Sequence, residues 1–203
     1  SNAILPLESK PEPNHPDGRP VFSPEIGYVQ RIDIPELQSA AEKFDLQINV
    51  QALPGTFLSP DQPLALVSYP KHTSKKDIDS GMIVNSFTIG RDRIYDEDPR
   101  FGFLTLSEIG SRALSPAVND PGTAIYIIDA YVRLFTNWSK AENDQQSEKL
   151  AYDRVVIPDI PLDELFDDAF NTIAHDGAGI IEVALLLQKA FKSLSSLSNE
   201  RLT

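Results

Sequence analysis

The chain of 203 residues carries a formal net charge of −12, with 30 acidic side chains against 18 lysines and arginines. This balance argues against nucleic-acid binding and against adhesion to anionic lipid headgroups, because both need a positively charged surface. The absence of cysteine excludes disulfides, thiol nucleophiles and thiolate metal sites. No apolar run approaches the roughly 20 residues that span a bilayer, so these residues are typical of a globular segment.

The first residues do not show the pattern of a folded domain. Ser1-Asn2-Ala3 resembles the remnant of a cleaved affinity tag, and we leave it out of the fold. Prolines then recur from Pro6 to Pro20 without any hydrophobic period, which is typical of an extended linker. We therefore predict a tag remnant and linker over residues 1–20, in a segment cut from a longer protein.

Residues 21–68 carry the pattern of a small β-rich module with one inserted helix. Gly27–Ile32 and Leu46–Ala52 alternate apolar and polar residues, as half-buried strands do. Between them, Asp33 can cap a helix that has Pro35 in its first turn. Short strands separated by proline and glycine turns are expected to complete the module.

This module resembles the barrel-sandwich, or hammerhead, architecture of biotinyl- and lipoyl-type carrier domains. The resemblance rests on Gly27-Tyr28-Val29, the inserted helix and the run Pro54–Leu58. Such domains present a modifiable lysine at a hairpin tip. No lysine occurs between Phe44 and Val67, so we do not expect covalently attached biotin or lipoate.

Residues 69–203 are predicted to be mainly helical, which gives an α+β fold overall. The stretch Asp79–Ile89 fits either a strand or a helix, and we favour a helix. A polar stretch near residues 139–150 predicts a mobile loop. The last helix, Ile180–Leu197, is apolar over a wide face, which indicates the centre of the core or an oligomer interface.

Two helix starts in this part have local signals. Thr105–Glu108 matches a capping box and predicts a helix from Leu106, which Pro116 ends. Asp120 can cap the next helix, with Pro121 at its first position. We prefer this capping role of Asn119-Asp120-Pro121 to a catalytic one.

Charged and turn-forming residues gather in Arg91–Gly102 and Ser115–Thr123, on predicted loops at helix ends, where binding sites are commonly built. The candidate residues for binding, or for a structural network, are Arg93, Asp98, Phe101, Gly102, Glu108, Arg112, Ser115, Asn119, Asp120 and Thr123. No residue is assigned as catalytic.

Two kinds of chemistry are open to this region, and a third to His175-Asp176 further along the chain. Its carboxylates (Asp92, Asp96, Glu97, Asp98) could gather magnesium, but they lack the spacing of an EF-hand loop, and we expect no metal site. Its arginines could bind a phosphate or carboxylate at the helix starts, although an internal ion-pair network is the interpretation we favour. His175-Asp176 could act as an acid and base, or could mark the break between two helices, and we favour the break.

Several short motifs also occur together in this chain. They are Asp98–Gly102, Leu106–Ile109, Arg112–Pro116 and Asn119–Ala124, with Gly27–Gln30 upstream and Asp168–Phe170 and Asp176–Gly179 downstream. In this combination the chain resembles domain of unknown function 2254, an uncharacterised family of predicted bacterial membrane proteins. The resemblance implies transmembrane helices before Ile4, in the bacterial inner membrane, with the present residues on the cytoplasmic side. It implies no activity or substrate.

Two functions follow as hypotheses. The first is a non-enzymatic domain that assembles subunits or senses a ligand, with the transmembrane part of the same chain and further copies of it as partners. The alternative is a hydrolase or phosphotransfer enzyme, with or without magnesium, that uses Arg93, Asp98, Glu108, Arg112 and Asp120. The enzyme hypothesis requires these five side chains to converge on one cleft. A mutual pairing of Arg93 with Asp98 would contradict it.

Overall fold

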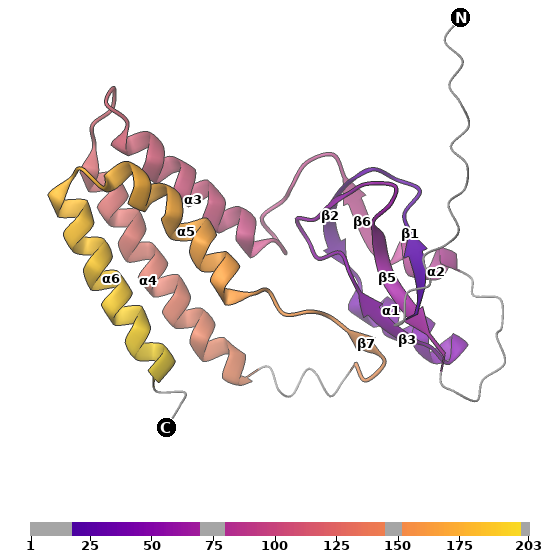
Figure 1. Ribbon diagram of the computed structural model, residues 1–203. Coiled ribbons are helices and arrows are strands. Elements are labelled where there is room, and N and C mark those ends of the chain that lie inside the picture. Colours follow the sequence, from indigo (N-terminus) through magenta and orange to yellow (C-terminus); the bar gives the residue numbers. More distant parts are fainter. Residues whose placement is uncertain (1–17, 70–79, 145–151, 200–203) are drawn as a thin grey trace, which may run out of the picture.

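The computed structural model describes residues 18–69, 80–144 and 152–199. They form a β-rich module and a helical module that lie side by side (Figure 1). The predicted α+β class is confirmed. The predicted tag remnant and almost all of the predicted linker lie outside the described residues.

The β-rich module consists of two sheets around one core. One sheet has the strand order β1-β5-β3-β7 and the other has the order β4-β2-β6. All neighbouring strands are antiparallel except β3 and β7, which are parallel. Buried side chains of both sheets, such as Val29, Ile48 and Leu64, form a single hydrophobic cluster. The strands are β1 (Arg19–Phe22), β2 (Gly27–Ile32), β3 (Gln47–Val50), β4 (Phe57–Leu58), β5 (Pro63–Ser68), β6 (Phe87–Gly90) and β7 (Val155–Val156).

Helix α1 (Ile34–Phe44) forms where the sequence predicts it. The Asp33 carboxylate accepts a hydrogen bond from the backbone N–H of Glu36, which satisfies one of the free donors of the first turn. Asp45 ends the helix in the left-handed conformation, at φ 54°. The buried face of α1, which includes Leu37, Ala40 and Ala41, packs into the core of the β-rich module.

Two strands of the β-rich module lie beyond residue 68. Strand β6 pairs with β2, and β7 pairs with β3. The helix favoured for Asp79–Ile89 was therefore wrong in its second half, because helix α2 covers only Ser80–Asn85. Phe87 is 6% exposed and pairs with Ile32. Its burial and its ladder hydrogen bonds outweigh the weak helical period of the sequence.

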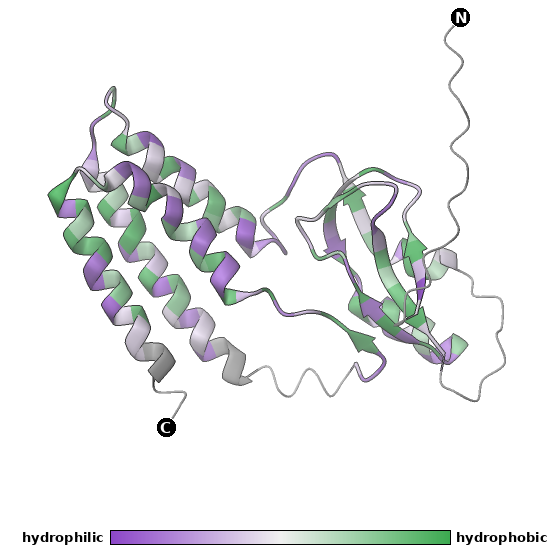
Figure 2. Ribbon diagram, in the orientation of Figure 1, coloured by the Kyte–Doolittle hydropathy of each residue, from purple (hydrophilic) through white to green (hydrophobic). Residues whose placement is uncertain are grey.

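The helical module is a bundle whose core is rich in aromatic rings. Tyr131 is fully buried and donates a hydrogen bond to the Phe103 carbonyl oxygen at 2.8 Å, and burial raises the pKa of its hydroxyl. Phe166 and Phe170 are 4.7 Å apart between ring centroids, and Phe191 lies 5.1 Å from Phe170. Hydrophobic and hydrophilic residues alternate along these helices (Figure 2). The helices are α3 (Pro99–Leu114), α4 (Pro121–Asp144), α5 (Leu162–Gly177) and α6 (Ile181–Asn199).

The start of α3 differs from its prediction. The helix begins at Pro99 with Asp98 as its N-cap, about two turns before Leu106. Thr105 lies inside the helix, where its hydroxyl donates to the Phe101 carbonyl oxygen at 2.8 Å. An aspartate followed by a proline at the first helical position is the stronger of the two start signals, because the proline ring presets the helical φ.

The predicted loop near residues 139–150 is also corrected in part. Helix α4 continues to Asp144, and residues 145–150 lie outside the described part. Trp138 packs against the core of the helical module, and the residues that follow it include good helix formers, so the helix extends into the polar stretch. Among the described residues, no helix combines the length and the apolar character needed to cross a membrane.

Candidate functional site

Arg93 and Asp98 pair with each other immediately before α3. Arg93 Nε lies 2.7 Å from Asp98 Oδ2, and Arg93 Nη2 lies 2.9 Å from Asp98 Oδ1. The Asp98 side chain is 3% exposed and that of Arg93 is 21% exposed. A carboxylate buried to this degree needs a cation and further hydrogen bonds to offset its lost hydration. Arg93 and Asp98, both candidate residues, therefore neutralise each other's charge.

Asp98 has two further contacts that fix its position. Its Oδ1 accepts a hydrogen bond from the Phe101 N–H at 3.0 Å, which caps α3 at the positive end of the helix dipole. Its carboxylate also packs directly against Gly55 of the β-rich module, where an added Cβ would collide with it. Gly55 adopts φ 90°, so both its backbone conformation and this contact require glycine.

The residues just before Asp98 are bonded to strand β2. Glu97 Oε2 accepts from the Ile32 N–H at 3.2 Å, and Glu97 Oε1 lies 3.2 Å from Arg31 Nε. We call Gly55, Arg93, Glu97 and Asp98 the joint, because they connect the β-rich module to the first turn of α3. Its four residues come from two segments of the chain.

Phe101 belongs to the same cluster. The guanidinium carbon of Arg93 lies 4.9 Å from the centroid of its ring, and the Tyr95 ring stacks on it at 4.4 Å. Gly102, the next candidate, is different, because an added Cβ would meet nothing within 4 Å. Nothing in the structure explains why glycine stands there.

Arg100 links α3 to α5. Its Nε lies 2.7 Å from Asp168 Oδ2, and its Nη1 lies 2.6 Å from Glu164 Oε2. The hydrogen bond that Arg100 donates to Asp168, together with the negative charges of Asp168 and Glu164, raises the pKa of Arg100. Arg93 and Arg100 both line a cavity of about 370 Å³ beside the joint, yet each is already neutralised by carboxylates. A phosphate in this cavity would have to compete with those ion pairs.

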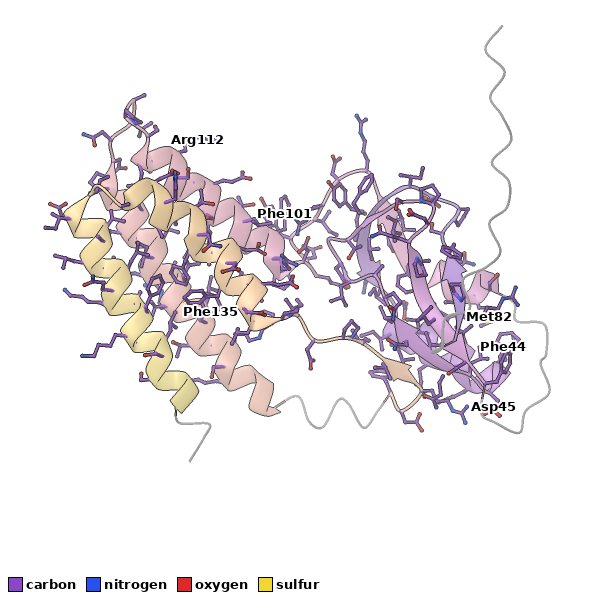
Figure 3. The ribbon with its side chains drawn as sticks, viewed as in Figure 1. Phe44, Asp45, Met82, Phe101, Arg112 and Phe135 are labelled. Carbon is purple, nitrogen blue, oxygen red and sulfur yellow. The ribbon has the colours of Figure 1, made fainter. Side chains whose placement is uncertain are left out.

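Glu108, Arg112 and Ser115 lie at the other end of α3. They border an open groove of about 630 Å³ that also contains Asp176. The Ser115 hydroxyl donates to the Arg112 carbonyl oxygen at 2.7 Å, which helps to end the helix. Figure 3 shows Phe101 at the end of α3 nearest the β-rich module, with Arg112 far from it.

His175 and Asp176 do not form the helix break, because α5 continues to Gly177. Asp176 accepts hydrogen bonds from the Ser111 hydroxyl and, at 2.9 Å, from His175 Nδ1. These two bonds, the Ser111 bond first, lower the pKa of Asp176. The His175 side chain is 88% exposed, so it faces solvent instead of an enclosed site.

Asn119, Asp120 and Thr123 build the start of α4. Asp120 Oδ1 accepts from the Thr123 N–H at 3.2 Å, and Asp120 Oδ2 accepts from the Thr123 hydroxyl at 2.6 Å. The pKa of Asp120 is lowered by the Thr123 hydroxyl first and then by the Thr123 N–H. Asn119 adopts φ 49°, a left-handed conformation that asparagine tolerates better than most residues. The predicted capping role of Asp120 is confirmed.

The five side chains required by the enzyme hypothesis do not converge. Arg93 and Asp98 close on each other at the start of α3, whereas Glu108 and Arg112 border a groove at its far end. At 1.5 Å per residue, Pro99 and Arg112 are about 20 Å apart along the helix. Within the described ranges, no three aspartate, glutamate or histidine side chains are grouped to hold a metal ion.

The helical module contains a cavity that sequence reasoning missed. It measures about 440 Å³ and lies between α4, α5 and α6. Its walls come from three helices, and the lining residues are spread from Phe135 to Ser195, so no local motif marks it. The lining residues are Phe135, Trp138, Ser139, Leu162, Asp163, Phe166, Asp167, Phe191, Leu194 and Ser195.

Comparison with known proteins identifies the class of this chain. The family described as "Predicted membrane protein (DUF2254)" matches residues 4–193, and the chain belongs to this family. Among similar curated proteins are uncharacterized proteins of Mycobacterium bovis and Mycobacterium tuberculosis, each 28% identical over 125 residues. Those residues make up 60% of this chain but only 24% of each relative's length. No solved structure matches the chain.

The joint predicts a strong energetic coupling between Arg93 and Asp98. Changing Arg93 to Met leaves the buried carboxylate without its cation, and we expect the free energy of unfolding to fall by about 3–5 kcal/mol. Asp98→Asn keeps a good N-cap side chain but removes the charge. The double variant should recover part of the loss, giving a coupling energy of about 1–3 kcal/mol in urea unfolding followed by circular dichroism.

Arg112→Met is the matched control, since it removes an exposed arginine from α3, the helix that Asp98 caps. Its effect should stay within about 0.5 kcal/mol. The structural role of the joint is contradicted if Arg93→Met is as stable as Arg112→Met.

Proposed function

We propose that this chain is the ligand-sensing part of a bacterial inner-membrane protein, placed on the cytoplasmic side and without catalytic activity of its own. A ligand would bind in the helical module, and the joint would pass the resulting change to the β-rich module. From there it would reach the transmembrane part through the residues that precede β1. The observation that carries this proposal is the buried Arg93–Asp98 pair, which makes the charged segment Arg91–Gly102 a structural connection between the two modules.

A continuous series of contacts connects the cavity to the joint. Helix α5 forms one wall of the cavity, and its Glu164 and Asp168 hold Arg100 of α3. Arg100 lies two residues after Asp98 in the chain, within the first turn of α3. A shift of α5 on ligand binding would therefore move the turn that Asp98 caps. Contiguity of this kind supports coupling, but only a measured response of both modules establishes it.

The alternative hydrolase or phosphotransferase has less support. Its five side chains are distributed over the two ends of α3 and the start of α4, and the arginine needed for phosphate binding is held by a carboxylate. General acid and base groups must lie within hydrogen-bond reach of one reacting group. No such arrangement brings these five residues together.

Sensing is tested by ligand screening followed by hydrogen exchange. Thermal denaturation is measured with a panel of small cationic, neutral and anionic compounds, and a compound at 100 times its Kd should stabilise the protein by about 2.7 kcal/mol. Amide exchange is then measured with the best compound. In the parent protein and in the Arg112→Met control, we expect the compound to slow amide exchange in both α5 and β2. In Arg93→Met, we expect it to slow exchange in the helices but not in β2.

Two results would contradict the sensing proposal. One is exchange that slows in the helices alone in the parent protein, because the joint would then transmit nothing. The other is chemical conversion of a panel compound by the protein, which would favour an enzyme.

Assembly is a second candidate function, favoured by the exposed apolar residues at the start of α6. Ile181 is 69% exposed and Leu185 is 51% exposed, one helical turn apart. Side chains of this size are commonly covered in oligomers when they form a contiguous patch. We propose that further copies of the chain associate through this face of α6.

Light scattering across a range of concentrations tests assembly. We expect the parent to associate at high concentration, and Ile181→Glu with Leu185→Glu to remain monomeric. The control is Ser193→Glu, which adds a charge to the same helix at an exposed position about 80–120° around the helix axis from Leu185 and Ile181. A parent chain that stays strictly monomeric at high concentration would rule out this interface.

A further inference from the structure

The cavity of the helical module has the size and lining of a small-molecule site. Its volume of about 440 Å³ falls within the range of roughly 300–1,000 Å³ that is usual for ligand pockets. Phe135, Trp138, Phe166 and Phe191 supply aromatic surface from all three helices around it. Phe166 lies 5.9 Å from Phe135 and 5.4 Å from Phe191 between ring centroids, so these rings form one connected group.

The same helix α5 carries two acidic pairs with the spacing of one helical turn. Glu164 and Asp168 close on Arg100 of α3. Asp163 and Asp167, one residue earlier in each turn, line the cavity instead. Across residues 18–69, 80–144 and 152–199, no hydrogen bond or ion pair neutralises either of these two carboxylates. Both side chains are exposed to solvent, and like charges four residues apart repel each other, without the arginine that Glu164 and Asp168 share.

We propose that this cavity binds an organic ammonium ion that carries an apolar body. Aromatic faces attract a cation through their quadrupole, and the strength of this attraction grows as the cation loses water. Asp163 and Asp167 add the opposite charge at the edge of the aromatic surface. Hydrated metal ions fit poorly, because they require several oxygen ligands and the walls are mainly aromatic and aliphatic. An anion would be repelled by both carboxylates.

This inference deepens the proposed sensing function and rests on it for its biological meaning. It assigns the chemical class of the ligand and the residues that select it. Sensing itself does not require that class, because a neutral or anionic compound could also bind the helical module. A result can therefore contradict the proposed ligand class without contradicting the proposed sensing function.

Trp138 provides a direct signal for the experiment. It is the single tryptophan of the sequence, and it lines the cavity. Hexyltrimethylammonium, 1-hexanol and hexanesulfonate are titrated into the protein below their aggregation concentrations, and Trp138 fluorescence is followed. We expect the ammonium compound to bind at least about tenfold more tightly than the alcohol, given the usual strength of a cation–π contact and an exposed ion pair. The sulfonate should bind weakest.

Charge variants then test the carboxylates. Asp163→Asn with Asp167→Asn should weaken binding of the ammonium compound by about tenfold while leaving 1-hexanol unchanged. The control removes two exposed acidic charges elsewhere, as Asp129→Asn with Glu182→Gln. This control should bind the ammonium compound as the parent does, which separates local recognition from the overall negative charge.

Three outcomes would overturn the inference. Equal affinity for the ammonium compound and the alcohol would define an apolar pocket without charge selection. Equal weakening by the two double variants would assign the effect to net charge. Failure of the ammonium compound to bind, with self-association that depends on Asp163 and Asp167, would assign these carboxylates to a second copy of the chain. If another panel compound binds and slows exchange in β2, the sensing function still stands.

Discussion

The burial of the Asp98 carboxylate is the constraint around which the two modules are arranged. A charge with 3% of its side chain exposed is tolerated only where every neighbouring group is placed to satisfy it. Arg93 supplies the cation, the first turn of α3 supplies a backbone donor, and Gly55 leaves room for the carboxylate. Each of these comes from a different local structure. Asp98 therefore holds the turn of the β-rich module, the connecting segment and the helix in one geometry.

This arrangement defines which residues connect the two modules. The modules have separate hydrophobic cores, one around the two sheets and one around the aromatic rings of the bundle. Between them, polar contacts at Glu97 and Asp98 lead into α3, and Arg100 leads from α3 into α5. Ion pairs need well-defined distances and angles, so a displacement of α5 is transferred to the joint more specifically than through an apolar contact. On α5, the two carboxylates that line the aromatic cavity, Asp163 and Asp167, each precede by one residue a carboxylate that holds Arg100.

Local signals in the sequence predict some of this structure well. Asp33 with Pro35 and Asp120 with Pro121 mark helix starts because capping involves only residues within one turn. The same aspartate–proline signal stands at Asp98 and Pro99, but the capping-box pattern at Thr105 competes with it. The proline makes the signal at Asp98 the stronger one, and the ion pair with Arg93 and the contact with Gly55, more than forty residues away in sequence, stabilise this start further. The sequence alone does not show that Asp98 and Gly55 lie next to each other in the fold.

The remaining differences between the predicted and the observed structure also arise from contacts between residues that are far apart in the sequence. Phe87 and Ile89 join a sheet because β2 offers them a partner, although the spacing of Met82, Ile83 and Phe87 also suits a helix. An internal ion-pair network is favoured for the charged segments because such pairs are often structural, and Arg93 and Asp98 form one such pair within the first of these segments. The bundle cavity could not be predicted, since Trp138, Phe166 and Phe191 meet only after three helices have packed.

The central claim is that Asp98 fixes the orientation of the two modules, and a distance measurement between them tests it most directly. The chain has no cysteine, so Glu36→Cys on α1 and Gln188→Cys on α6 can carry spin labels without background. Double electron–electron resonance should give one narrow distance distribution in this protein and in an Arg112→Ala variant of it. Asp98→Ala should broaden the distribution while circular dichroism shows that the helices remain. A distribution in Asp98→Ala as narrow as that of the parent would contradict the account.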